Sequence, residues 1–501
     1  MKRENQIGWI AICGTFLLYP ILPQYIYIFK GLNIVNFCGV LTIIGVIIGG
    51  VIYKCKIPYL IFPYILYATY YSISYCAEGA WLSALSLAMM MVVIPLLSVG
   101  FVNTNRRFET AINLLIDGGF ILSLLGIVES ITKINLFQLF SNANGLTFFH
   151  EVRYGFLRIM GTFGQPISYG LYHVFIIALI IYRLKNYTQY SQKHTFLKVA
   201  YLLSVINILL TVSRIPIIAC ILLHILLLYK KSKKEFINYA VAISILLLVL
   251  IIFNDTVGMK IPLISDLLSS IGTVTFDNEI NSGGVGDRFV LWQWVALSVG
   301  NKWLLGKGVS TEFAYKVYEW QTKTSIENQY LNVFFHTGVV GVVLLLFSYV
   351  AVLVYAKRKN SSCSGSCSFN TIFFSMMLIY FVCELGVQET DLARMYCIWI
   401  SLLISYNRID QNNRLQMYEQ GVTGEISTNR QDLPKCYFLS HNFWVLNTKL
   451  LKQSNGEGQQ PWGFMGDNIA YYEIEESIDI HKMIDLYIAK EWIEENYDEV
   501  E

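Results

Sequence analysis

Charged residues are scarce in this chain. They make up 14% of its 501 residues, whereas a soluble domain carries about a quarter. Apolar residues reach 55% and recur in runs close to the length of about 20 residues that a helix needs to cross a bilayer. This composition excludes a soluble globular protein. The 37 basic and 35 acidic residues nearly cancel, so the net charge indicates no nucleic-acid partner.

Several motifs that carry chemistry are also absent. The sequence has no Walker A loop, no GxGxxG that opens a helix after a strand, no HExxH and no convincing external Asp-x-Asp pair, the closest being Asp277 and Glu279. Most of the ten cysteines lie in or beside apolar runs, and Cys363 and Cys367 have no second pair to complete a zinc site. We therefore expect neither a metal site nor a cofactor.

The apolar runs between charged residues predict an all-α polytopic membrane protein with about twelve transmembrane helices. The predicted spans are 8–29, 34–53, 58–76, 80–101, 111–131, 163–182, 199–213, 215–229, 237–254, 329–355, 370–388 and 392–407. Lys and Arg concentrate in alternate short loops, and the positive-inside rule then places both termini in the cytoplasm. The seventh and eighth spans are short and meet at Ser213-Arg214-Ile215-Pro216, so they could instead be one kinked pair.

Two parts of different composition follow from this topology. Residues 1–408 form a membrane domain with two extracytoplasmic loops, 132–162 and the larger 255–328 between spans nine and ten. Residues 409–501 form a tail rich in acidic residues, which we expect in the cytoplasm as a small appendage or partner-binding segment. Long loops are usually functional, so the two external loops are the first place to look for chemistry.

One segment of the larger loop has helical periodicity. GDRFVLWQWVALSVG places Arg288 and Trp292 four residues apart, on one face of a helix. We expect this helix to lie on the surface of the outer leaflet. Its aromatic residues fit an interfacial belt, so Arg288 and Trp292 are either membrane anchors or ligands for a substrate.

External arginines are the more informative ones, because the positive-inside rule already explains the cytoplasmic ones. Arg214 sits in a tight outward turn between Ser213 and Pro216, which suits the first turn of the next helix. A guanidinium beside free helix N–H groups forms an anion site suited to phosphate, although an arginine that reaches from a hairpin to lipid headgroups is an equal alternative. Arg158 precedes a Gly-rich break at the start of span six, which is either a ligand site or a simple turn.

The segment SIENQYL closes the large loop and leads into span ten. Glu327 at this membrane boundary is a candidate general base, and a solvated carboxylate in the first turn of a helix is the alternative. His336 lies nine residues further along, about 13 Å deeper at the standard helical rise, where an interhelical hydrogen bond would also explain it.

Acidic residues in or near the spans suggest a different class of function. Asp117, Glu129 and Glu384 raise the alternative of a proton-coupled transporter of polysaccharide or lipid-linked sugar. Such transporters have interrupted helices in two repeated halves, whereas the external loop here is single and asymmetric.

Three segments together resemble the superfamily of bacterial O-antigen ligases and O-antigen or capsular polysaccharide (Wzy-like) polymerases. RIMGTFGQPISYG is similar to its Arg and Gly-Thr-Phe motif, and TVSRIP is similar to its Ser-Arg turn. DRFVLWQWVAL, LLGKGVS and ENQYLNVFFHTGVVG resemble its large external loop. The similarity spans residues 158–342 and leaves the tail outside. Ligases of the superfamily commonly have His-Asn where this chain has Glu327-Asn328, which favours a polymerase.

The resemblance implies a bacterial inner-membrane enzyme that polymerises polyprenyl-pyrophosphate-linked oligosaccharides into a surface polysaccharide without a metal; transfer to an acceptor by a ligase is the alternative. It implies that Arg214 and Arg288 hold the pyrophosphate and that Glu327 takes the acceptor proton. The residues expected to bind substrate are Arg158, Asn328, Tyr330, Trp292 and His336. Expected partners are membrane lipids and the lipid-linked substrates, with a chain-length regulator and a flippase as candidates.

Overall fold

The computed structural model describes fourteen stretches of the chain, and structural statements below concern these alone. They are residues 4–29, 32–48, 58–138, 152–153, 156–186, 192–231, 285–318, 321–323, 325–360, 368–387, 392–412, 414–415, 469–470 and 487. The chain divides into two compact units, Met1–Asn407 and Arg408–Glu501.

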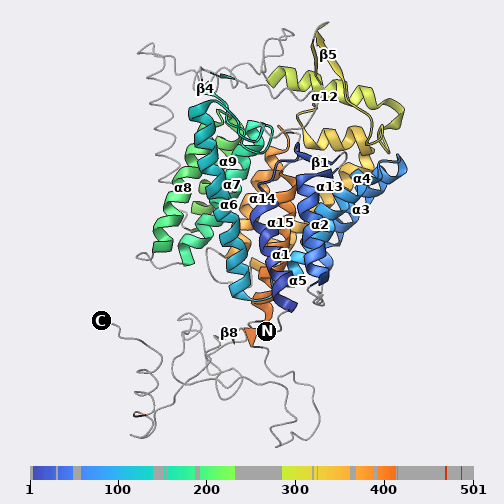
Figure 1. Cartoon of the computed structure of the whole chain (residues 1–501). Coiled ribbons are helices and arrows are strands. Elements are labelled where there is room, and N and C mark those ends of the chain that lie inside the picture. Colours follow the sequence, from blue (N-terminus) through green and yellow to red (C-terminus); the bar gives the residue numbers. More distant parts are fainter. Residues whose placement is uncertain are drawn as a thin grey trace, which may run out of the picture. The chain divides into compact units, whose positions relative to one another are not determined.

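The first unit is a helical bundle with small two-stranded hairpins (Figure 1). Its first half contains α1 (Glu4–Leu18), β1 (Tyr27–Phe29), β2 (Leu32–Asn33), α2 (Ile34–Ile48), η1 (Tyr59–Ile61), α3 (Phe62–Ala77), α4 (Trp81–Ala88), η2 (Met89–Val93), α5 (Ile94–Phe101) and α6 (Asn105–Thr132). Its second half contains β3 (Val152–Arg153), β4 (Phe156–Leu157), α7 (Pro166–Asn186), α8 (Gln192–Leu210), α9 (Arg214–Lys231), α12 (Val285–Val299), η4 (Gly300–Lys302), β5 (Tyr315–Tyr318), β6 (Gln321–Lys323), α13 (Gln329–Asn360), α14 (Phe369–Cys383) and α15 (Ala393–Asn412), the last of which runs into the second unit. In the described part of the second unit, β7 (Arg414–Leu415) pairs antiparallel with β8 (Ile469–Ala470).

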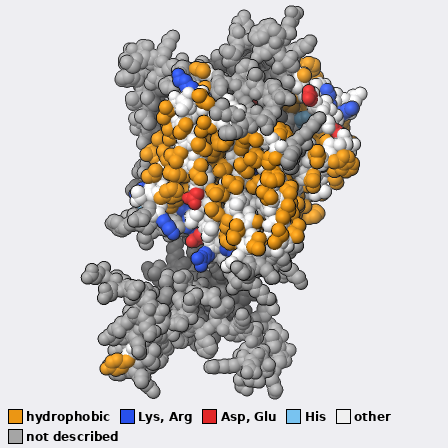
Figure 2. Space-filling model, viewed as in Figure 1, with side chains coloured by type: hydrophobic (Ala, Val, Ile, Leu, Met, Phe, Trp, Pro, Cys, Tyr) orange, Lys and Arg blue, Asp and Glu red, His pale blue; other side chains and the backbone are white. Residues whose placement is uncertain are grey.

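The bundle has the surface of a membrane protein. Within the described stretches, five helical segments are long and apolar enough to cross a bilayer: Trp81–Phe101, Asn105–Thr132, Pro166–Leu184, Lys193–Leu210 and Gln329–Arg358. Apolar side chains cover the broad middle of the face seen in Figure 2, and charged side chains lie mostly towards its two ends. A soluble monomer rarely exposes so large an apolar surface, so the chain is an integral membrane protein of mainly helical fold. The predicted number of twelve spans is not established by these helices.

Several predicted spans differ from the observed helices. The first was predicted over 8–29, but α1 ends at Leu18 and the chain then enters the β1–β2 hairpin. The fourth is continuous yet contains the π-helical turn η2 between α4 and α5. The seventh and eighth are two separate helices, and α8 begins at Gln192, earlier than expected. The eleventh, predicted to reach residue 388, ends at Cys383.

The segments expected to be functional gather at one end of the bundle. In Figure 1, β4, α12 and β5 lie at the end opposite the start of α1, and α12 runs across the bundle helices. We call this the α12 end. It carries the helix predicted within the larger loop, now observed as α12, although its contact with a leaflet stays a prediction.

Some predictions fall outside the described residues. These are span nine, residues 139–151 and 154–155 of loop 132–162, residues 255–284 with Asp277 and Glu279, the Cys363 and Cys367 pair, and nearly all of the 409–501 tail.

Candidate functional site

Arg214 stands at the first position of α9, after a very tight turn. α8 ends at Leu210, and the amide of Val212 donates to the carbonyl of Leu209 at 3.0 Å. Val212 has a φ of +48°, a left-handed conformation that is exceptional for a β-branched residue. Pro216 lies in the first turn of α9, where a missing N–H costs nothing, as the sequence predicted. The turn therefore places the partly buried Arg214 beside the amides in the first turn of α9.

Arg158 is held against this same turn. Its side chain is 7% exposed, its Nε donates to the carbonyl of Thr211 at 3.1 Å, and its Nη2 donates to the hydroxyl of Ser213 at 2.7 Å. These two acceptors flank Val212 on either side. Arg158 therefore lies beside the turn that precedes Arg214, because it binds the backbone and a side chain of that turn.

Glu129, in the last turn of α6, fixes the segment that carries Arg158. Its buried carboxylate accepts hydrogen bonds from the amides of Met160 at 3.1 Å and Gly161 at 2.9 Å, and from Nδ2 of Asn135 at 3.1 Å. Asn135 also donates to the carbonyl of Gly161 at 2.7 Å. Three donors satisfy a carboxylate that would otherwise be costly to bury. This role was missed from the sequence, where nothing links residue 129 to residues 160 and 161.

Glu327 lies where the segment that follows α12 enters α13. Its φ is +54°, and the residues after it are tied to the end of α14. Asn328 is 3% exposed; its Oδ1 accepts from the amide of Leu331 at 3.0 Å and its Nδ2 donates to the carbonyl of Leu385, also at 3.0 Å. The amide of Gln329 donates to the carbonyl of Glu384 at 2.9 Å. Asn328 is thus the N-cap of α13, and its amide group is used in fixing the position of Glu327.

α13 is broken at Gly338, near its start. This residue has φ +67° and ψ −165°, which is not helical. The backbone groups released by the break bond to residues 303–308 instead. The amides of Val339 and Val340 donate to the carbonyls of Trp303 at 2.9 Å and Leu304 at 3.3 Å.

Two further bonds run in the opposite direction. The amides of Lys307 and Gly308 donate to the carbonyls of Phe335 at 2.8 Å and His336 at 3.0 Å. Segment 303–308 therefore completes the broken helix, as a backbone interruption in a membrane protein requires.

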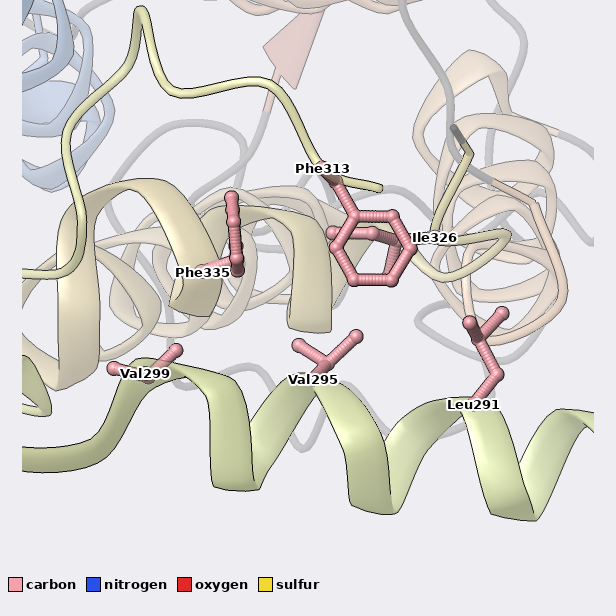
Figure 3. Packing of buried hydrophobic residues seen from close by; sticks show 6 residues of the cluster. All are labelled: Leu291, Val295, Val299, Phe313, Ile326 and Phe335. Carbon is pink, nitrogen blue, oxygen red and sulfur yellow. The ribbon is translucent and has the colours of Figure 1, made fainter. Parts of the chain in front are cut away.

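α12 packs on this region through one apolar face. Leu291, Val295 and Val299 recur every four residues and point towards Phe313, Ile326 and Phe335 (Figure 3). Because Ile326 immediately precedes Glu327, this contact connects α12 to the candidate general base. Arg288 lies in the first turn of α12, and its side chain is outside the described residues. Trp292 is partly buried one turn further on.

Tyr330 and His336 occupy structural positions on α13. The hydroxyl of Tyr330 donates to the carbonyl of Phe381 at 2.6 Å, and Nδ1 of His336 donates to the carbonyl of Asn332 at 2.8 Å. Next to them, the hydroxyl of Tyr349 donates to the buried carboxylate of Glu384 at 2.6 Å. Their predicted contact with substrate stays a prediction.

Glu78 binds the segment between α12 and β5. It caps the C-terminus of α3, and its carboxylate accepts from the amides of Val309 at 2.8 Å and Ser310 at 2.6 Å. Partial burial alone would raise the pKa of Glu78, but the hydrogen bonds from Ser310 and Val309, with His336 nearby, lower it below its usual value. No sequence signal pointed to this contact.

Apart from Arg288 and Trp292 on α12, the predicted site residues form two groups. Arg158 and Arg214 lie together at the α8–α9 turn, while Glu327, Asn328, Tyr330 and His336 lie along the start of α13. α14 contacts both α9 and α13 and so lies between the two groups. Among the described residues, no three His, Cys, Asp or Glu side chains are grouped as metal ligands.

Left-handed backbone conformations occur close to several of these residues. Three non-glycine residues in the described stretches have positive φ: Lys133, Val212 and Glu327. One follows the helix of Glu129, one precedes Arg214 and one is the candidate base. Such strained conformations gather at functional sites, so this distribution supports the location of the site.

Comparison with known proteins gives one family. Residues 199–346 match the family model described as O-antigen ligase (Wzy_C). The matched segment contains Arg214, Arg288 and Glu327, and it confirms the predicted resemblance to the ligase and Wzy-like superfamily. No curated protein matches the chain.

Proposed function

We propose that this protein polymerises polyprenyl-pyrophosphate-linked oligosaccharide repeat units into a surface polysaccharide, such as a capsule, an O-antigen or an exopolysaccharide. The reaction takes place at the outer face of the bacterial cytoplasmic membrane, and both termini are cytoplasmic. The family match supports a role in surface polysaccharide assembly by glycosyl transfer. The observation that carries the proposal is Arg214 at the first position of α9, because a guanidinium beside helix N–H groups suits a pyrophosphate.

In the proposed mechanism, a hydroxyl group of one repeat unit attacks the anomeric carbon of another glycan. The bond from that carbon to the pyrophosphate oxygen breaks, and the polyprenyl pyrophosphate leaves with the bonding electron pair. Arg214 and Arg288 stabilise the negative charge that develops on the leaving group. Loss of one such donor typically costs about 10²-fold or more in rate. Glu327 accepts the proton of the attacking hydroxyl.

The residue proposed as the base favours a polymerase over a ligase. Ligases that resemble this chain commonly have His-Asn at the corresponding place, whereas this chain has Glu327-Asn328. Asn328 holds the backbone at the start of α13, so Glu327 is presented on a fixed segment. Two of the three acids that suggested a transporter, Glu129 and Glu384, are bound by neighbouring groups, so they give that alternative no support.

Four variants test the proposal at matched protein levels: Arg214→Lys, Arg214→Ala, Glu327→Gln and Arg106→Lys. Lysine supplies charge without the planar fork of arginine, so Arg214→Lys should lose nearly as much polymer as Arg214→Ala. Glu327→Gln should lower turnover about a hundredfold or more while donor binding persists. Arg106→Lys, at the exposed start of α6, is the control and should be normal.

The measurement is a gel of lipid-linked and surface glycans. In cells that carry an inactive variant, single repeat units that accumulate on the lipid carrier identify the protein as a polymerase. Long polymer that stays unattached to its acceptor in these cells identifies it as a ligase. Normal polymer from Arg214→Ala would refute the role of Arg214 in donor binding, and an active Glu327→Gln would remove Glu327 from the mechanism.

A further inference from the structure

We propose that Arg158 is a positioning residue, anchored by Glu129, which holds the strained turn before Arg214 in the one conformation that directs Arg214 at the donor. This inference rests on the proposed function, because it assigns a task to a residue that acts through Arg214. It replaces a direct contact between Arg158 and the pyrophosphate with a contact to the protein itself.

The first step of the argument is the geometry around Val212. A φ of +48° is strained for valine, and such a residue persists only where its surroundings fix it. Arg158 provides that restraint, since its guanidinium binds Thr211 on one side and Ser213 on the other. The two bonds bracket Val212 and end one residue before Arg214.

The second step is the burial of Arg158. Only 7% of its side chain is exposed, and its Nε and Nη2 both donate to the turn. A guanidinium used in this way stabilises the α8–α9 turn. The amide of Ile159 adds a longer bond of 3.4 Å to the carbonyl of Leu210, so the backbone of the two segments is also joined.

The third step is the anchor. Arg158 can restrain the turn only if its own segment is fixed, and Glu129 binds the amides two and three residues further on. Gly161 has a φ of +53° and packs so closely on Tyr169 that a Cβ atom would overlap the ring. The hydroxyl of Tyr169 in turn donates to the carbonyl of Leu122 on α6 at 2.9 Å. Segment 158–161 is thus connected to α6 directly through Glu129 and indirectly through Tyr169.

The decisive test is rescue by a glycine. Arg158→Lys should lower kcat of the polymerase reaction about 10²-fold, the scale expected when a reacting group is displaced by about 1 Å. Glycine adopts a positive φ without strain, so with Val212→Gly the turn no longer needs Arg158 to keep its conformation. The double variant Arg158→Lys/Val212→Gly should therefore recover much of the activity. Glu129→Gln should lower kcat in the same way, whereas Glu109→Gln at the other end of α6 should not, although it removes an ion pair with Arg183.

Direct donor binding by Arg158 gives a different pattern. Arg158→Lys would then raise KM for the lipid-linked donor, and Val212→Gly would not restore activity; that result overturns the inference. Ser213→Ala is the milder variant in case Arg158→Lys folds poorly, since it removes one bond of the pair. Its effect should be non-additive with that of Arg158→Lys, because both variants remove the same contact. Additive effects would also overturn the inference.

Thermal unfolding of the purified variants separates this inference from the proposed function. The loss of stability caused by Arg158→Lys should be smaller in the Val212→Gly background whatever reaction the protein catalyses. If that coupling appears while Arg214→Ala leaves polymer synthesis intact, the restraint of the turn stands and the proposed function fails. If Arg214 is required but no coupling appears, the inference alone fails.

Discussion

Replacement of Gly338 by alanine tests how the site end of α13 is built. At φ +67° and ψ −165°, Gly338 adopts a conformation that is essentially restricted to glycine. A Cβ atom here would overlap the carbonyl oxygen of Leu304 and would lie 2.6 Å from the amide nitrogen of Gly306. Both are backbone atoms, so no side-chain rotation can relieve the overlap.

The magnitude follows from two contributions. The backbone conformation alone costs a non-glycine residue about 1–3 kcal/mol. If the overlap separates segment 303–308 from α13, the four hydrogen bonds from residues 335–340 to that segment break, and each contributes about 0.5–1.5 kcal/mol. The total of about 3–9 kcal/mol is comparable with the whole stability of a typical domain. We therefore expect Gly338→Ala to abolish polymer synthesis and to lower the midpoint of thermal unfolding.

The assay needs a control glycine without such contacts. Among the described residues, none outside the local helix lies within 4 Å of the place that a Cβ atom would take on Gly100 in α5. Alanine in a helix is about 0.5–1 kcal/mol more stable than glycine. Gly100→Ala should therefore leave synthesis normal and the unfolding midpoint unchanged or higher. The reasoning about the break is refuted if Gly338→Ala behaves like Gly100→Ala in both measurements.

Three more outcomes are expected. Glu78→Gln should weaken the hydrogen bonds to the amides of Val309 and Ser310, which would appear as faster hydrogen exchange at residues 307–311. In the unchanged protein the stabilisation by these bonds should be complete above the ordinary glutamate pKa and lost as the pH falls through the lowered pKa of Glu78. Ser282→Cys should react with an impermeant thiol reagent in intact cells, and labelling only after lysis would reverse the predicted sides. Synthesis by purified protein should survive a strong chelator, and specific restoration by a divalent ion would point to Asp277 and Glu279.

The sequence predicted the elements of the α8–α9 turn well, because its signals are local. Apolar runs on each side predicted two helices, and Pro216 marked the first turn of the second. The same signals placed Arg214 at a helix start, where the structure has it. What they could not predict is the left-handed Val212, since valine carries no preference for that conformation.

Contacts between distant segments account for most of what the sequence could not reveal. Glu129 was considered as a proton-coupling acid, and the structure shows it bound to amides 31 and 32 residues away. An apolar run predicted a single helix over 329–355, whereas the break at Gly338 depends on segment 303–308, which has no sequence pattern that links it to α13. Such pairings depend on backbone groups, which are the same in every residue and leave no mark in the sequence.

These irregular segments share a physical cause. A straight helix satisfies its own backbone groups and offers a ligand only its side chains, whereas an interrupted helix also offers amides and carbonyls. In a membrane protein every such group must be covered by another part of the chain. Segment 303–308 covers the break in α13, and Arg158 covers the carbonyl of Thr211 in the turn before α9. The first turn of α9, which begins at Arg214, has amides without acceptors inside the helix, and a pyrophosphate is the kind of ligand that would accept hydrogen bonds from them.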